Sequence, residues 1–158
     1  MNDLALRPIK DQEVESCLIL CRESMMHASH YSLAERQAWA AFDDRDWGAR
    51  LTQQHSWGAF TSDQTLRGVA SWRAGDSDEG WLDLLYVSPT CQRLGVGNAL
   101  LGRVEAEALQ LGFENIQTQA SLHLQPLLRQ RGYITLEVRR PVVRGQALPC
   151  AWMQKVLP

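Results

Sequence analysis

The chain of 158 residues is long enough for one domain with a sizeable core, and its composition is that of an ordinary globular protein. Its formal net charge of −2 argues against nucleic acid as a partner, because such partners require a strongly basic face. The charge is uneven, with eight basic and thirteen acidic residues in 1–79 against eight and five in 80–158, which either is chance or indicates an anionic ligand on the C-terminal half and a cationic one near the N-terminal half.

The first third of the chain is predicted to be helical. Apolar residues three to four positions apart indicate the first helix, with Asp11 as its N-cap. Ser32 is followed three residues later by Glu35, a capping-box pattern that predicts the start of a second helix. A further short helix follows. The predicted helical ranges are 14–26, 32–41 and 46–54.

The pattern then changes to β-rich runs separated by polar turns. The predicted strands are 56–61, 65–74, 81–87, 115–121, 134–143 and 150–156. A helix over 95–111 presents a core face of Val96, Leu100, Val104, Ala108 and Leu111 and ends at Gly112, and a second, short helix lies within 122–133. The strand 81–87 is the most apolar and is expected at the centre, with Asp83 as its one charge.

This order predicts an α+β fold, with a mixed, mostly antiparallel central sheet flanked by helices and one strand–helix–strand crossover. Residues 1–158 show no repeat, linker or low-complexity segment, so we expect a single domain.

The N-terminal segment and the cysteines favour a cytoplasmic protein. The start "MNDLALRPIKD" lacks the basic and apolar regions of a signal peptide, and no apolar run reaches membrane-spanning length. Cys17 and Cys21 lie one helical turn apart, but no second close pair accompanies them, so no metal site is expected. Cys91 and Cys150 complete the set, and reduced thiols are the default.

Two glycines stand where the helix after the central strand begins, in "SPTCQRLGVGNALL". A phosphate-binding P-loop is excluded, because no Gly-Lys-Ser/Thr occurs. The dinucleotide fingerprint fits poorly, because Leu100 occupies its sixth position. A helix N-terminus nevertheless attracts anions, and Gly95 and Gly97 have no Cβ to keep a pyrophosphate away. Arg93 can add a charge-assisted hydrogen bond, or these residues only shape a turn.

At this point the sequence resembles the GNAT superfamily of N-acetyltransferases. "LDLLYVSPTCQRLGVGNALL" is similar to the family's acyl-CoA-binding segment, and "ASLHLQPLLRQRGY" resembles its next strand and helix, while the N-terminal half matches in layout. The resemblance implies that acetyl-CoA is the co-substrate. The cofactor-binding residues it implies are Leu85, Tyr86, Val87, Gln92, Arg93, Leu94, Gly95, Val96, Gly97, Asn98 and Ser121.

The resemblance further implies that the central strand splays from its neighbour and that its backbone binds the thioester. The acceptor amine needs a base, and Asp83 is the best candidate, unless it points outward or pairs with an arginine. Many members carry a tyrosine, the usual acid for the leaving thiolate, where this chain has Leu128. Tyr31 is a possible catalytic substitute, although a packing or lid role is the stronger interpretation.

The predicted function is transfer of an acetyl group from acetyl-CoA to a primary amine of a small molecule or peptide, by a monomer or homodimer. Neither a metal, a nucleic acid nor a membrane is expected to take part. Two other interpretations stay open: a non-catalytic acyl-CoA-binding sensor or regulatory module, and a toxin-type partner-binding protein that has only inherited the fold.

Overall fold

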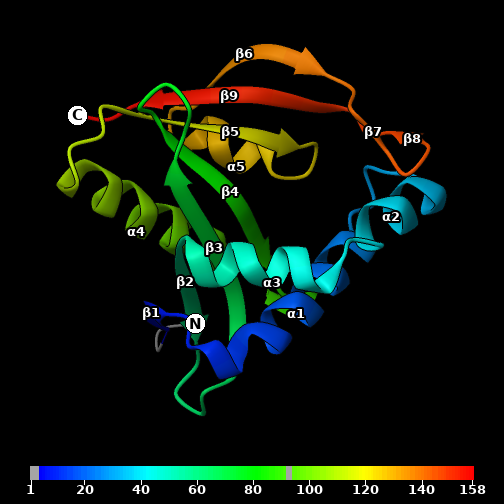
Figure 1. The fold of residues 1–158 in the computed structure, drawn as a ribbon, viewed down its shortest axis with the longest axis horizontal. Coiled ribbons are helices and arrows are strands. Elements are labelled where there is room, and N and C mark those ends of the chain that lie inside the picture. The colour runs from blue at the N-terminus through cyan, green and yellow to red at the C-terminus, as the bar shows by residue number, and fades with distance from the viewer. Residues whose placement is uncertain (1–3, 92–93) are drawn as a thin grey trace.

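The computed structural model describes residues 4–91 and 94–158, so the predicted cofactor contacts Gln92 and Arg93 lie outside the described residues. The chain forms the predicted α+β fold, in which helices flank a mostly antiparallel sheet (Figure 1). The helices are α1 (Val14–Met26), α2 (Leu33–Ala40), α3 (Asp44–Gln53), α4 (Val96–Gln110) and α5 (Gln125–Gln130), with short 3-10 turns η1 (Asp11–Glu13) and η2 (Pro89–Cys91). The strands are β1 (Ala5–Pro8), β2 (His55–Phe60), β3 (Leu66–Ala74), β4 (Gly80–Val87), β5 (Asn115–Ser121), β6 (Ile134–Arg139), β7 (Val142–Val143), β8 (Gln146–Ala147) and β9 (Cys150–Val156).

Seven strands form one sheet in the order β1-β2-β3-β4-β5-β9-β6. All neighbours in it are antiparallel except β4 and β5, which run parallel and are connected through α4. The predicted central strand and the crossover through α4 are therefore confirmed. Strands β5 and β6, which both run antiparallel to β9, are parallel to each other and form a further crossover through α5. Strands β7 and β8 pair separately as a small hairpin that lies beside α2 (Figure 1).

The sheet has a core on each face. On one face Leu100, Leu101 and Val104 of α4 are fully buried against the strands, as expected for most of the predicted stripe. The prediction that Leu111 belongs to this core face was wrong, because Leu111 is the C-cap of the helix and is 54% exposed. On the other face Cys21 and other residues of α1 pack with apolar residues of α3, β3 and β4.

Local sequence signals account for the helix ends. The Ser32–Glu35 capping box is present, with the Ser32 hydroxyl accepting from the Glu35 backbone N–H. At the end of α4, Gly112 has φ of +92°, and two reverse hydrogen bonds close a Schellman motif: Gly112 N–H to Leu109 O and Phe113 N–H to Ala108 O, each 3.0 Å. This motif turns the chain back into β5.

Three predictions at the ends of the chain were wrong. Strand β1 was missed, because its four residues include a proline and show little alternation; it pairs with β2 at the sheet edge. Asp11 lies in η1, and Glu13 occupies the N-cap of α1. The strand predicted over 134–143 breaks before Pro141, which has no N–H to continue the ladder. Within residues 4–91 and 94–158, no helix has the length and apolarity to cross a membrane.

Candidate functional site

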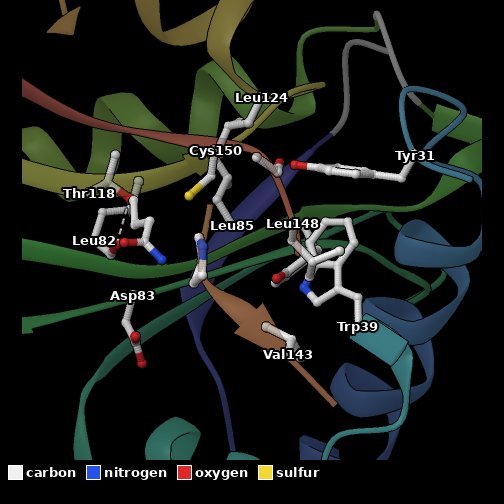
Figure 2. A pocket seen from close by; sticks show the side chains of 14 residues that line it. Tyr31, Trp39, Leu82, Asp83, Leu85, Thr118, Leu124, Val143, Leu148 and Cys150 are labelled. Carbon is white, nitrogen blue, oxygen red and sulfur yellow. Dashed lines mark hydrogen bonds between the residues drawn. The ribbon is translucent and has the colours of Figure 1, made fainter. Parts of the chain in front are cut away.

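The central strands separate at the middle of the sheet. Parallel pairing between β4 and β5 covers only Gly80–Leu82 against Ile116–Thr118. At the last of these pairs the Thr118 hydroxyl donates to the Leu82 carbonyl at 2.8 Å, drawn as a dashed line in Figure 2. Beyond this point the two strands diverge, which is the splay that the family resemblance implies.

A cavity of about 150 Å³ occupies the splay. Strands β4 and β5 form its inner wall, and Trp39 of α2 and the segment from Pro141 to Cys150 form its outer wall (Figure 2). The lining residues are Tyr31, Trp39, Leu82, Asp83, Leu85, Tyr86, Thr118, Gln119, Ser121, Leu124, Pro141, Val143, Leu148 and Cys150. Of the residues predicted for the site, Asp83, Tyr31, Leu85, Tyr86 and Ser121 meet here.

Asp83 stands at an irregularity of β4. Pairing with β3 passes from Ser71–Leu84 directly to Trp72–Leu82, so Asp83 is the extra residue of a β-bulge. Its side chain is 15% exposed and accepts a hydrogen bond of 3.0 Å from the Gln54 amide. Its carboxylate also lies 3.8 Å from Arg50. Asp83 thus both lines the cavity and faces an arginine, which combines two interpretations that the sequence left as alternatives.

Tyr31 lies on the opposite side of the cavity from Asp83 (Figure 2). Its hydroxyl donates to the Pro149 carbonyl at 2.5 Å and accepts from the Leu122 N–H at 2.9 Å. Burial raises the pKa of this phenol to about 12, against the opposing effect of the Leu122 N–H. The phenol is therefore protonated at neutral pH and ties the loop before α2 to two other loops.

Other candidate acids near the cavity are weak. Leu128, which replaces the usual tyrosine, has no ionisable group and is fully buried in the core. Burial lowers the pKa of His123 to about 4, with a smaller contribution from His30, so the ring is neutral at pH 7. Its Nδ1 contacts the Ser121 hydroxyl at 3.1 Å. Cys150, which the sequence did not single out for the site, lines the cavity with a thiol whose pKa burial raises.

The two glycines of the turn, Gly95 and Gly97, have different structural roles. Gly95 is the N-cap of α4 with φ of +85°, and a Cβ there would meet nothing within 4 Å. Gly97 instead lies against other side chains: a Cβ there would be 3.0 Å from Leu127 Cδ2 and 3.5 Å from Val87 Cγ2. Gly95 thus supplies the left-handed turn, whereas Gly97 allows α4 to approach α5 and β4 closely.

The rest of the turn offers backbone more than side chains. Leu94 is exposed and Val96 is buried in the core. Both side chains are apolar, so neither can offer a polar group to a ligand. The Asn98 amide oxygen accepts from Arg131 at 2.7 Å. As in any α-helix, the first N–H groups of α4 have no partner within the helix, and they carry the positive end of its dipole.

A larger hollow of about 620 Å³ lies beside this helix start. It is lined by Gly95, Asn98, Leu127, Gln130, Arg131 and Lys155. Its two cations both bind the Glu105 carboxylate, Arg131 at 2.7 Å and Lys155 at 2.9 Å. The hollow combines a helix N-terminus, amide groups and two cations, which suits a polyanionic ligand.

Comparison with known proteins gives concordant results. The profile of the acetyltransferase (GNAT) family matches residues 19–138. The uncharacterised N-acetyltransferase YafP of Escherichia coli is 28% identical over 147 residues, which cover 92% of this chain and 91% of YafP. The structure of a GCN5-related N-acetyltransferase from Rhodopseudomonas palustris superposes with a TM-score of 0.90 at 27% identity, covering 99% and 98% of the two chains. The PaiA N-acetyltransferase of Thermoplasma acidophilum, solved with coenzyme A, has a TM-score of 0.76 at 18% identity, covering 98% and 99%.

Proposed function

Because the chain belongs to the GNAT family of acetyltransferases and is thus an acyltransferase, we propose that it moves an acetyl group from acetyl-CoA to a primary amine of a small molecule or peptide. The observation that supports this most strongly is the cavity at the β4–β5 splay, which Asp83 of β4 lines. The helix start at Gly95 follows the same strand along the chain. We further propose that residues 1–158 form one acetyltransferase domain.

Acetyl-CoA fits the residues around the splay. In this proposal the backbone of Leu85, Tyr86 and Val87 orients the thioester, and Ser121, which lines the same cavity as Leu85 and Tyr86, also contacts the cofactor. Fixed backbone donors at a developing oxyanion contribute typically about 3 kcal/mol to catalysis. The pyrophosphate binds the N–H groups at the start of α4, from Gly95 to Asn98, whereas the Leu94 N–H donates to the Cys91 carbonyl at 3.3 Å. Gln92 and Arg93 stay predicted contacts.

The acceptor must lose a proton before it attacks. An alkyl ammonium has a pKa of about 10.4, so only about one amine in two thousand is neutral at pH 7. We assign the proton-accepting role to Asp83, because this residue lines the cavity and is the charged residue of the central strand. The ammonium group of the acceptor gives one proton to Asp83, and its nitrogen then attacks the thioester carbon. The nitrogen releases its second proton to water, and the carbon–sulfur bond breaks to release the CoA thiolate.

The thiolate needs less help. A thiol pKa of about 8.5 lies about 1.5 units above pH 7, worth about 2 kcal/mol, whereas the amine lies more than three units uphill. Because Leu128 is buried and the Tyr31 proton is held by Pro149 O, we propose that the reaction runs without a dedicated general acid. In this proposal water protonates the sulfur after its release. The alternative is that Tyr31 acts as a weak acid.

We place the reaction in the cytoplasm, since all four cysteines are free thiols, the state that a reducing compartment maintains.

The proposal is tested by incubating the purified chain with acetyl-CoA and a panel of primary amines, and by measuring release of the CoA thiol. Amine-dependent release is expected, and the near-isosteric Asp83→Asn should slow it most at neutral pH and least at high pH, where the amine is already neutral. Binding of acetyl-CoA without turnover of any amine would favour the sensor interpretation instead. A loss of rate that is equal at every pH would remove Asp83 from the role of base.

A further inference from the structure

A line of three polar side chains leads away from Asp83 and ends at a backbone carbonyl. Gln54, the C-cap of α3, contacts Asp83 Oδ2 at 3.0 Å and the Ser71 hydroxyl at 2.8 Å. The Ser71 hydroxyl lies 2.9 Å from that of Ser56, which in turn lies 2.7 Å from the Leu51 carbonyl. Ser56 and Ser71 are directly paired on β2 and β3, and both are buried.

When Asp83 is ionised, there are too few protons for each of the four contacts in this line to be a hydrogen bond. Each hydroxyl owns one proton, and a carboxylate owns none. The Gln54 NH₂ group then turns to Asp83, so the Ser71 proton must turn to the Gln54 oxygen. The single proton of Ser56 has to serve both remaining contacts, to Ser71 and to Leu51. One of the four contacts is left as two facing oxygens, in a buried place where such a contact is costly.

When Asp83 carries a proton, there is one proton for each of the four contacts. The Asp83 hydroxyl donates to the Gln54 oxygen, after the amide has rotated to exchange its oxygen and nitrogen. The Gln54 NH₂ then donates to Ser71, Ser71 to Ser56, and Ser56 to the Leu51 carbonyl. Each of the four contacts now holds one proton, and all point in one direction.

We propose that Gln54, Ser71 and Ser56 are positioning residues that stabilise the protonated form of Asp83, formed when it accepts the proton of the acceptor amine. This inference rests on the proposed function for its place in the reaction, whereas the hydrogen-bond line itself does not. The line moves no proton across the sheet; it reverses its direction, and Asp83 later returns its proton to water.

Other groups that face Asp83 act against the line or leave it unchanged. Arg50 on α3, at 3.8 Å, favours the carboxylate, but it is shared with Asp46 at 3.4 Å. The Tyr86 phenol on β4 also faces Asp83, and burial raises its pKa well above its ordinary value, so it stays neutral. From β3 the uncharged Ser71 acts on Asp83 through Gln54. The balance between Arg50 and the serine line therefore sets how readily Asp83 binds a proton.

The variant that separates the two directions is Ser56→Ala. Without the Ser56 hydroxyl, the ionised arrangement has one proton for every remaining side-chain contact, whereas in the protonated arrangement Ser71 has no acceptor. Ser56→Ala should therefore lower the proton affinity of Asp83 about tenfold, which is a fall of about one pH unit in its titration midpoint. Ser56→Thr, which keeps the hydroxyl, should restore the midpoint of the parent protein.

The measurement is the ¹³C carboxyl titration of Asp83 by NMR, with Asp83→Asn used to assign the signal. The matched control is Ser24→Ala, because Ser24 is equally buried, its hydroxyl has no partner among the described residues, and it belongs to α1. This control should leave the midpoint unchanged. The pH dependence of kcat/KM for amine acetylation should shift in the same direction as the titration.

The outcomes distinguish the two hypotheses. A midpoint that stays within about 0.2 pH unit in a folded Ser56→Ala protein, or that rises, overturns the positioning role, whatever the enzyme acetylates. A midpoint that falls as expected, in a protein whose acetylation of amines does not depend on Asp83, supports the hydrogen-bond line and removes Asp83 from catalysis.

Discussion

The Glu105 carboxylate links three elements around the helix that begins at the glycine turn, which makes Glu105→Gln a sharp test of the fold. It accepts from Arg131 twice, at 2.7 and 3.1 Å, from Lys155 at 2.9 Å and from the Tyr133 hydroxyl at 3.0 Å. Arg131 also holds Asn98, in the first turn of α4. Loss of the charge should therefore loosen the packing of α4 against α5 and β9.

The expected cost follows from what an amide can replace. The glutamine oxygen can still accept from Arg131 Nη2 and Lys155, but its NH₂ group would face the Nε–H of Arg131. Removing one partner of a buried ion pair costs about 3–5 kcal/mol. Because Arg131 and Lys155 keep about a fifth of their side chains exposed and can turn to water, we expect about 2–3 kcal/mol. That corresponds to a fall in Tm of roughly 4–12 °C for a chain of this size.

The pH dependence gives an independent check. Burial alone would raise the pKa of Glu105, but the hydrogen bonds and charges of Arg131 and Lys155 outweigh it and lower the pKa. A carboxyl with a lowered folded pKa stabilises the protein above its unfolded value, about 4.3, and loses that contribution as the pH falls through the folded value. The difference in Tm between parent and variant should thus be constant near neutral pH and shrink below about pH 4.3.

Thermal unfolding followed by circular dichroism measures both effects. The matched control is Glu107→Gln on the same helix, because Glu107 accepts from the indoles of Trp57 and Trp72, and an amide oxygen can keep both bonds. It should cost less than about 1 kcal/mol. A loss of Tm no larger in Glu105→Gln than in Glu107→Gln would show that the network contributes little.

Three more predictions concern single positions. Gly95→Ala should lower Tm through strain at φ of +85° and weaken acetyl-CoA binding measured by calorimetry, whereas Gly112→Ala, at φ of +92°, should lower only Tm. Equal acetyl-CoA affinities of the two variants would remove the turn from the site. Tyr31→Phe removes hydrogen bonds to two loops and should cost about 1–3 kcal/mol in urea unfolding but less than about tenfold in turnover; loss of a steep alkaline fall in rate would instead identify Tyr31 as the acid. The Arg7 hydrogen bond lowers the pKa of Glu13 to about 2, so Glu13→Gln should destabilise at pH 6 by about 1 kcal/mol, with the difference vanishing between pH 4 and 2.

The parts of the fold that sequence predicts best are those that local chemistry determines. The capping box at Ser32 and the C-terminal glycine of α4 each act within one helical turn, so they can be read without knowing the neighbours. Strand β1 forms only because β2 offers an edge, so its own four residues carry little signal. The exposure of Leu111 has the same origin, because it depends on where the helix ends relative to the sheet.

The candidate site divides in the same way. Contiguous sequence identifies the glycine turn and Asp83. It does not identify the outer wall of the cavity, because Trp39 and Leu148 come together only through the hairpin that follows β6. Gln54 was also missed, since nothing in its neighbours shows that the end of α3 lies beside the bulge in β4.

That bulge connects the two halves of the site. Without an extra residue in β4, Leu82 and Leu84 would face the same side of the sheet, because side chains alternate along a strand. Instead Leu82 packs in the core beneath α4 and Leu84 packs in the core beneath α1. The change of face occurs at Asp83, next to Leu82, where pairing with β5 ends. One irregularity therefore directs the carboxylate toward α3 at the position where the strands separate, so the proposed base and the proposed thioester cavity lie at the same local distortion.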